Sequence, residues 1–74
     1  MPNPQYDEIT RVWRVRKLHR HIDAQIRRDS ACELQLIYND RIIYKRIWNT
    51  VEEAQADAAV KLADLQRAGW TEHW

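Results

Sequence analysis

The sequence contains little of several residue types, and each shortage excludes a class of protein. Among its 74 residues there are one Gly, one Cys and no Phe. A single Gly cannot make a Gly-rich loop, and Cys32 alone cannot form an internal disulfide, so a reducing cytoplasm is the expected location. No apolar run approaches the ~20 residues of a membrane span, and the opening MPNPQYDE lacks the charged and apolar regions of a signal peptide. We therefore expect a cytoplasmic protein that has no membrane partner.

Tryptophan, in contrast, is abundant, because the chain contains four Trp. A folded chain of this length buries roughly 60% of the surface that its unfolded form exposes, so its stability is marginal unless something supplements the small core. The Trp side chains must therefore supply apolar bulk, contact a partner, or do both. The aromatic and branched aliphatic content also excludes a disordered chain.

The formal net charge of +1 favours neither an anionic nor a cationic partner, but the charges are unevenly distributed. Residues 1–48 hold ten Lys or Arg against six Asp or Glu, whereas residues 49–74 hold two against five. Two interpretations stay open: ordinary solvated faces, or a polarised domain with one face for an anionic partner.

Alternation of apolar and polar residues predicts three half-buried antiparallel strands, which a fourth apolar run follows. The residues on the core side of the three strands are Trp13, Val15, Ile22, Ala24, Ile26, Cys32, Leu34, Leu36 and Tyr38. The run from Ile42 to Trp48 is apolar on both faces, so alternation alone does not assign it.

Loop lengths predict the pairing of the first three strands, because a slip of one residue moves all the apolar side chains of a strand to its other face. A two-residue loop at Leu18-His19 pairs Val15 with Ile22. An odd loop near residues 29–31 keeps the core sides of the second and third strands together.

Asn39-Asp40 predicts a second two-residue loop, since Asn and Asp tolerate positive φ. The resulting register pairs Leu36 with Ile43 on the core side and Glu33 with Arg46 on the other side. A three-residue loop would reverse the fourth strand and bury Arg46, so we reject it.

The residues from Thr50 onward predict a helix. Thr50 and Glu53 have the spacing of a capping box, and an apolar stripe with a 3.6-residue period runs through Val51, Ala54, Ala58, Leu62 and Leu65. The outward positions are Glu53, Asp57, Val60, Asp64 and Arg67. Gly69 followed by Trp70 predicts a Schellman stop, in which Trp70 packs on Leu65.

Together these elements predict an α+β domain over residues 10–70. It is a four-stranded antiparallel meander with one C-terminal helix packed on one face, in the order ββββα. Residues 1–9 are expected to form a mobile N-terminal arm, and residues 71–74 a C-terminal tail.

The helix leaves the other face of the sheet uncovered, and the registers predict which residues lie there. They are Val12, Arg14, Arg16, His21, Asp23, Gln25, Arg27, Glu33, Gln35, Ile37, Ile42, Tyr44, Arg46 and Trp48. A solvated face rarely combines so many aromatic, isoleucine and arginine side chains.

We consider three interpretations of this face. The first is self-association as a homodimer, or the binding of another protein, since exposed apolar patches with Trp, Tyr and Arg are typical of interfaces; its residues are Ile37, Ile42, Tyr44, Arg46 and Trp48. The second is nucleic-acid binding, in which rings stack on bases and arginines neutralise phosphate; its residues are Arg14, Arg16, Arg27, Arg46 and Trp48. In the third, Trp48 turns toward the helix start and the face binds nothing.

Residues suited to catalysis or metal binding are few. His19 and His21 share a face, and Cys32 or His73 could complete a metal site with them, but Cys32 is predicted on the core side. Asp23 and Glu33 are predicted opposite arginines, which favours salt links over acid–base catalysis. We therefore expect a non-enzymatic binding module with no metal, no cofactor and no small-molecule substrate.

Several motifs resemble those of a loose class of short bacterial ββββα proteins without an assigned activity. The matching features are a Trp-led first strand, a second hairpin closing on a pair such as Asn39-Asp40, an Ala-rich helix opening Glu52-Glu53-Ala54, and a terminal Gly69-Trp70. The resemblance covers Trp13 to Trp70 and implies the same fold.

Two segments also resemble the APETALA-type DNA-binding domain, namely residues 24–27 (AQIR) and 50–54 (TVEEA). That family has a three-stranded sheet with a C-terminal helix and reads the major groove with Arg and Trp. The resemblance implies DNA contacts by Arg14, Arg16, Arg27, Arg46 and Trp48. The longer stretch between the two segments here indicates an extra strand.

Overall fold

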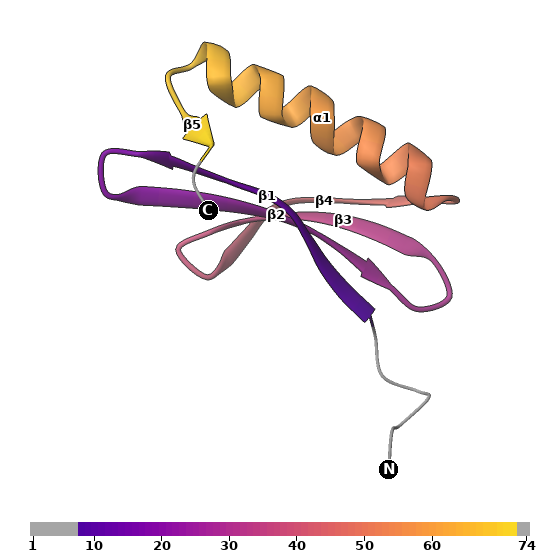
Figure 1. Cartoon of the computed structure of the whole chain (residues 1–74). Coiled ribbons are helices and arrows are strands. Elements are labelled where there is room, and N and C mark those ends of the chain that lie inside the picture. Colours follow the sequence, from indigo (N-terminus) through magenta and orange to yellow (C-terminus); the bar gives the residue numbers. More distant parts are fainter. Residues whose placement is uncertain (1–7, 73–74) are drawn as a thin grey trace.

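The computed structural model describes residues 8–72, which form an antiparallel sheet with one helix across one of its faces (Figure 1). The elements are β1 (Glu8–Lys17), β2 (Arg20–Arg28), β3 (Cys32–Tyr38), β4 (Arg41–Trp48), α1 (Val51–Arg67) and β5 (Thr71–Glu72). This arrangement is the predicted α+β fold, a four-stranded meander followed by a C-terminal helix, with a short fifth strand added. β1 begins two residues before the expected domain start at residue 10.

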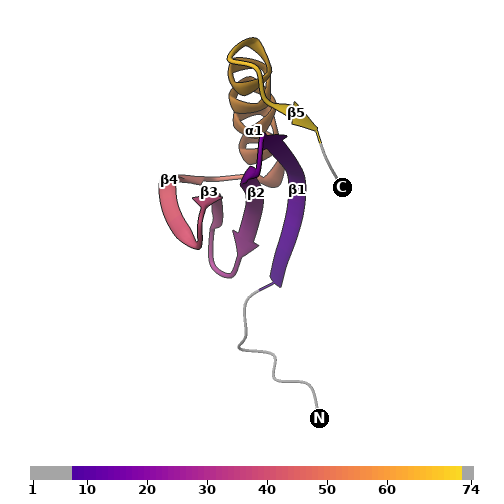
Figure 2. The same ribbon diagram turned by 90° about the vertical axis from the view of Figure 1, so that its left-hand side faces the viewer.

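The strand order in the sheet is β4-β3-β2-β1-β5, so β4 forms one edge and the two-residue β5 lies outside β1 at the other (Figure 2). Residues 71–74 were predicted as a tail, but Thr71 pairs with Arg16 and Glu72 with Val15. The Thr71 hydroxyl also donates to the Arg16 carbonyl at 3.3 Å. β5 thus covers one end of β1. Trp74 and residues 1–7, including most of the predicted arm, lie outside the described residues.

The pairing of the first three strands follows the predicted registers. Lys17 pairs with Arg20 around the Leu18-His19 loop, and Val15 faces Ile22. Leu18 takes the positive φ of 58° that this tight loop requires. A three-residue loop then separates Arg28 from its partner Cys32.

The fourth strand differs from the prediction because it contains a β-bulge. The Asn39-Asp40 loop is confirmed, with both residues at positive φ, and Ile37 pairs with Ile42. Leu36, however, pairs with Tyr44, so that Ile43 is an extra residue. One extra residue exchanges the faces of everything after it. The predicted pairs Leu36–Ile43 and Glu33–Arg46 are therefore wrong, and Glu33 faces Ile47 instead.

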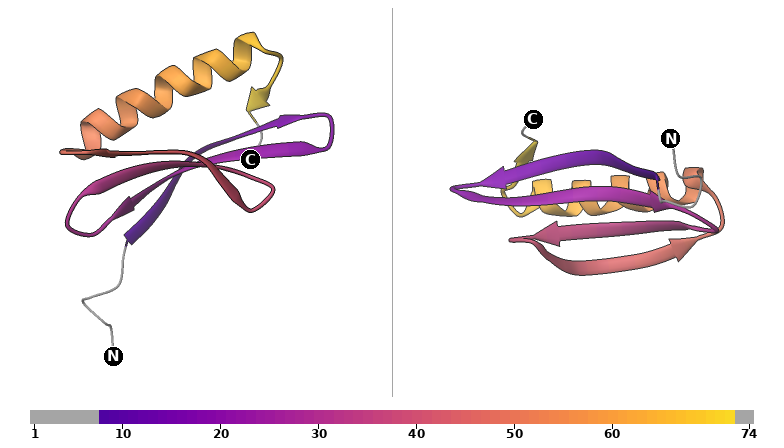
Figure 3. Two further views of the ribbon diagram at one scale, coloured as in Figure 1. Left: turned by 180° about the vertical axis from the view of Figure 1, so that it is seen from behind. Right: turned by 90° about the horizontal axis from the view of Figure 1, so that it is seen from below.

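A second irregularity lies in β1, where the register shifts between Arg11 and Trp13. Val12 is the extra residue, and it packs against the core rather than on the uncovered face where it was predicted. The rest of the uncovered face of β1 to β3 is as predicted. Figure 3 (right) looks onto this face, with α1 behind the strands and β4 along one edge.

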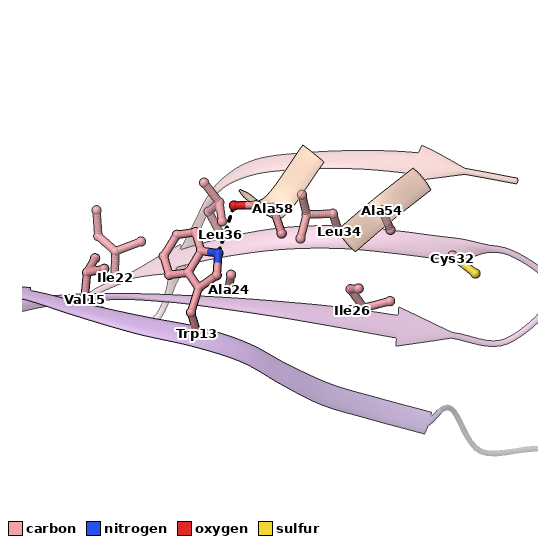
Figure 4. Packing of buried hydrophobic residues seen from close by; sticks show 10 residues of the cluster. All are labelled: Trp13, Val15, Ile22, Ala24, Ile26, Cys32, Leu34, Leu36, Ala54 and Ala58. Carbon is pink, nitrogen blue, oxygen red and sulfur yellow. Dashed lines mark hydrogen bonds between the residues drawn. The ribbon is translucent and has the colours of Figure 1, made fainter. Parts of the chain in front are cut away.

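The core lies between α1 and the covered side of β1, β2 and β3 (Figure 4). Ala54 and Ala58 are fully buried, because short side chains let the helix axis approach the sheet. Trp13 is 3% exposed, and its Nε1 donates a 2.9 Å hydrogen bond to the Ala58 carbonyl. This bond joins the first strand to the middle of the helix.

Both helix ends have the predicted caps. At the start, the Thr50 hydroxyl accepts from the Glu53 amide, and the Glu53 carboxylate accepts from the Thr50 amide. At the end, Gly69 has φ of 99°, and the Trp70 amide donates to the Leu65 carbonyl at 3.0 Å. This bond, with a second from the Gly69 amide to the Gln66 carbonyl, makes the Schellman motif.

Candidate functional site

Tyr44 and Trp48 point toward α1, where both contact the same carboxylate. The Tyr44 hydroxyl donates to Asp57 Oδ2 at 2.6 Å, and Trp48 Nε1 donates to that oxygen at 3.3 Å. Lys61 Nζ donates to the other oxygen, Oδ1, at 3.1 Å. Asp57 was predicted to point outward, but its side chain is only 9% exposed. Asp57 therefore connects the edge strand β4 to the helix.

The pKa of Asp57 reflects this environment. Burial of the carboxyl raises its pKa, but hydrogen bonds from Tyr44 and Lys61 and the charge of Lys61 lower it by more, so the pKa lies below the ordinary value. The hydrogen bond to Asp57 raises the pKa of Lys61. The Lys61 ammonium also lies 4.6 Å from the centre of the Tyr44 ring, a cation–π distance.

Arg46 lies on the helix side too, since it pairs with Leu34, a core residue. The prediction that reversing the strand would bury Arg46 is wrong, because its guanidinium stacks 4.0 Å above the Trp48 ring and the residue stays exposed. Beside it is an open hollow of about 310 Å³, here called the β4–α1 hollow. It is lined by Arg46, Trp48, Glu53, Ala56, Asp57 and Val60.

The predicted protein-binding cluster is thus divided between the two sides of the sheet. Ile37 and Ile42 lie on the uncovered face, as predicted. Tyr44, Arg46 and Trp48 lie on the helix side, and Trp48 turns toward the helix as in the third interpretation of this surface. The bulge at Ile43 is the cause.

The predicted nucleic-acid site is divided in the same way. Arg14, Arg16 and Arg27 share the uncovered face, while Arg46 and Trp48 are on the other side. Every aromatic side chain within residues 8–72 packs in or against the core. The described part of the uncovered face therefore offers no Trp or Tyr ring for base stacking.

Polar side chains on the uncovered face are largely engaged with one another. Arg14 Nε donates to Asp23 at 2.6 Å, and this hydrogen bond, with the Arg14 charge, holds the pKa of Asp23 below its ordinary value. Gln25 donates to Gln35, which donates to Glu33. Salt links rather than acid–base catalysis were predicted here, and Arg14–Asp23 is such a link.

Exposed hydrophobic side chains gather around β4 instead. There are six large ones within residues 8–72, and Ile42, Ile43 and Ile47 are all on β4. A fourth, Val60, lines the β4–α1 hollow beside that strand. We name the three isoleucines together with Arg41, Lys45 and Arg46 the β4 edge surface.

The charge and hydrogen bonding of β4 also differ from those of the other strands. Its sequence, RIIYKRIW, has three cationic side chains and no acidic one. β4 pairs with β3 alone among the described strands, so the amides and carbonyls of alternate residues point outward without a strand partner.

Sequence reasoning missed Asp57, Ile43 and Ile47 as residues of this region. For Asp57 a signal existed, because it stands four residues before Lys61 on the helix flank next to the predicted fourth strand. For the isoleucines the signal was the absence of apolar–polar alternation in β4. Without it, the sequence does not show which side chains lie on which face of the strand.

Within residues 8–72, the structure also bears on the cysteine, on metal binding and on membrane spanning. Cys32 is buried, and residues 8–72 contain no cluster of three potential metal ligands. Over the same residues, no helix has both the length and the apolar character to cross a membrane.

Comparisons of the chain with protein-family models, with curated proteins and with solved structures find no match to it. The two resemblances noted from sequence motifs therefore stay predictions.

Proposed function

We propose that this chain is a small non-enzymatic binding module that associates with protein, either another copy or a different partner, on the β4 side of its sheet. The observation that carries the proposal is the concentration of exposed hydrophobic side chains there. Four of the six within residues 8–72 lie on β4 or line the adjacent hollow. Exposed apolar patches are typical of interaction sites.

The arrangement of charges around these side chains supports the same proposal. Interfaces commonly combine an apolar centre with arginine and a polar rim. On β4, Lys45 and Arg46 stand between Ile43 and Ile47 and provide that combination. A domain with so small a core also gains stability from a partner that binds only its folded form.

A photo-crosslinking amino acid placed at position 47 tests the proposal, and the same amino acid at position 9 is the matched control. Ile47 and Ile9 are exposed by 64% and 57%. Both lie on the uncovered face, Ile47 on β4 and Ile9 on β1, toward opposite edges of the sheet. In cells that express the chain, position 47 should form a protein adduct that position 9 does not. No adduct at position 47 would contradict the proposal.

The mass of the adduct, with light scattering on the purified chain, separates self-association from a different partner. A molar mass that rises with protein concentration supports a homodimer. A monomer at all concentrations, combined with a heavier adduct, supports a different protein.

Nucleic-acid binding through the uncovered face is the alternative proposal. Its support is the group of basic side chains on β1 and β2, namely Arg14, Arg16 and Arg27. Phosphate contacts are strongest at low ionic strength, so titration of a labelled oligonucleotide at low salt should give binding. If none is found there, the alternative is excluded.

A further inference from the structure

We propose that the β4 edge surface binds an extended polypeptide segment in which acidic and apolar residues alternate, and that this segment adds to β4 as a further strand of the sheet. This inference rests on the proposed function and specifies the partner: not a second copy of the chain, but an acidic segment. Its side chains on one side would enter the β4–α1 hollow.

The two edges of the sheet differ in their strand pairing. At the β1 edge, β5 already pairs with Val15 and Arg16. At the β4 edge no described strand pairs, although β4 is eight residues long. The bulge at Ile43 disturbs one end only, so residues 44–48 remain a regular stretch. Such an edge is a template for strand addition, which supplies affinity through main-chain hydrogen bonds.

The β4–α1 hollow lies where an added strand would place side chains. Side chains of an added strand alternate between the two sides of the sheet, so every second one would lie between β4 and the helix. There Trp48, Ala56 and Val60 offer apolar contact. On the opposite side of the sheet, the intervening side chains would lie beside Ile42 and Ile47.

The acidic groups lining the hollow already have hydrogen-bond partners. Asp57 is held by Tyr44, Trp48 and Lys61, and the Glu53 carboxylate belongs to the helix cap. A carboxylate entering the hollow would meet the Arg46 guanidinium, which lines it.

The charge of β4 identifies the occupant. β4 carries Arg41, Lys45 and Arg46 and no acid. A second copy pairing through its own β4 would bring three more cations and no acid to this edge, and like charges on adjacent strands are destabilising. An acidic segment instead forms opposite-charge pairs.

The probe is a fluorescein-labelled heptapeptide of alternating Val and Glu, with binding to the full chain followed by fluorescence anisotropy. We expect saturable binding that weakens at high salt. Amide hydrogen exchange should slow within residues 44–48 when the peptide is added, because these amides either donate hydrogen bonds to the peptide or are shielded from solvent by it. Two control peptides are a Val/Lys heptapeptide and the Val/Glu heptapeptide N-methylated at its central amides, and neither should bind.

Variants of the protein test the surface itself. Lys45→Glu should weaken binding about tenfold or more, since attraction at the surface becomes repulsion, and Ile47→Glu should weaken it by a similar factor. The matched controls are Arg20→Glu and Ile9→Glu, which make the same chemical changes away from β4 and should alter affinity less than about twofold. Circular dichroism establishes that each variant is folded.

Three results would overturn the inference: no binding of the Val/Glu peptide, equal binding of its N-methylated form, or a concentration-dependent dimer of the wild-type chain that Lys45→Glu abolishes. The last result would make a second copy the occupant. The proposed function has a separate readout, because a position-47 crosslink with no peptide binding supports a protein partner and rejects strand addition.

Discussion

At the scale of single residues, the three Trp within residues 8–72 all have structural contacts. Trp13 donates to the helix backbone at Ala58, and Trp48 donates to Asp57. Trp70 follows Gly69 in the helix stop and packs against the core. The abundance of Trp is therefore explained by the fold of a small domain that contains no Phe, in which large rings join sheet and helix.

Asp57 joins β4 to α1 by accepting hydrogen bonds from Tyr44 and Trp48. We expect Asp57→Asn to lower the free energy of unfolding at neutral pH by about 1–2 kcal/mol, because the charge-assisted bonds from Tyr44, Trp48 and Lys61 are weakened. Chemical denaturation of both proteins measures the difference. A change below the error of the measurement would show that Asp57 does not hold the strand.

The same difference should depend on pH in a defined direction. The pKa of Asp57 in the folded chain lies below its ordinary value of 3.8. Its contribution is therefore fully present above that value and is lost as the pH falls below it, through the folded pKa. Wild type and Asp57→Asn should converge in stability over this acid range.

Asp64→Asn is the control for both measurements. Asp64 is on the same helix and contacts Arg67, but its side chain is 52% exposed. An exposed ion pair contributes little, so this variant should change the unfolding free energy by less than about 0.5 kcal/mol.

At the scale of elements, the sequence predicted those features that depend on a few neighbouring residues. The capping box at Thr50, the stop at Gly69 and the positive-φ pair Asn39-Asp40 each have local chemistry that the structure confirms. The first hairpin was predictable because its alternation is strict and one register alone keeps the apolar side chains of both strands together.

The faces of β4 were not predictable in this way. With isoleucines on both sides, its sequence is compatible with two registers that differ only by a bulge. The choice depends on a contact far along the chain, because Tyr44 and Trp48 reach Asp57 only when Ile43 is the extra residue. The candidate site was misassigned for the same reason, since its aromatic side chains belong to the helix side.

Deleting Ile43 tests the bulge directly. Ile42 and Tyr44 already face opposite sides of the sheet, so joining them gives a regular strand in which each side chain keeps its side. We expect the variant to fold, with Leu36 still opposite Tyr44 and the Trp48 indole proton still hydrogen-bonded. Nuclear Overhauser contacts between β3 and β4 provide the measurement.

The opposite result would be equally clear. If the strand were regular with Ile43 in place, as first predicted, its deletion would exchange the faces after position 43. Tyr44 would then lie opposite Gln35 in the wild type, and contacts between Leu36 and Tyr44 would appear only after the deletion instead of in both proteins.

At the scale of the whole molecule, the two edges of the sheet are protected to different degrees. The β1 edge is covered at one end by β5, and Arg11, Arg14, Arg16 and Lys17 lie along it. Charged side chains on an edge strand discourage pairing with another chain. The β4 edge has cations as well, but three exposed isoleucines accompany them. The exposed isoleucines therefore favour the β4 edge over the β1 edge as the binding surface.

Ending the chain after Trp70 tests this difference, because it removes β5 and exposes the rest of β1. The pairs formed by Thr71 and Glu72 are lost, and with them the Thr71 bond to the Arg16 carbonyl, so the unfolding free energy should fall by about 1 kcal/mol. The arginines of β1 should still prevent association, so light scattering should give the molar mass of the truncated monomer at every concentration at which the full chain is monomeric. Association that begins only after the truncation would show that β5, rather than charge, protects this edge, and β1 would then be a second surface capable of strand addition.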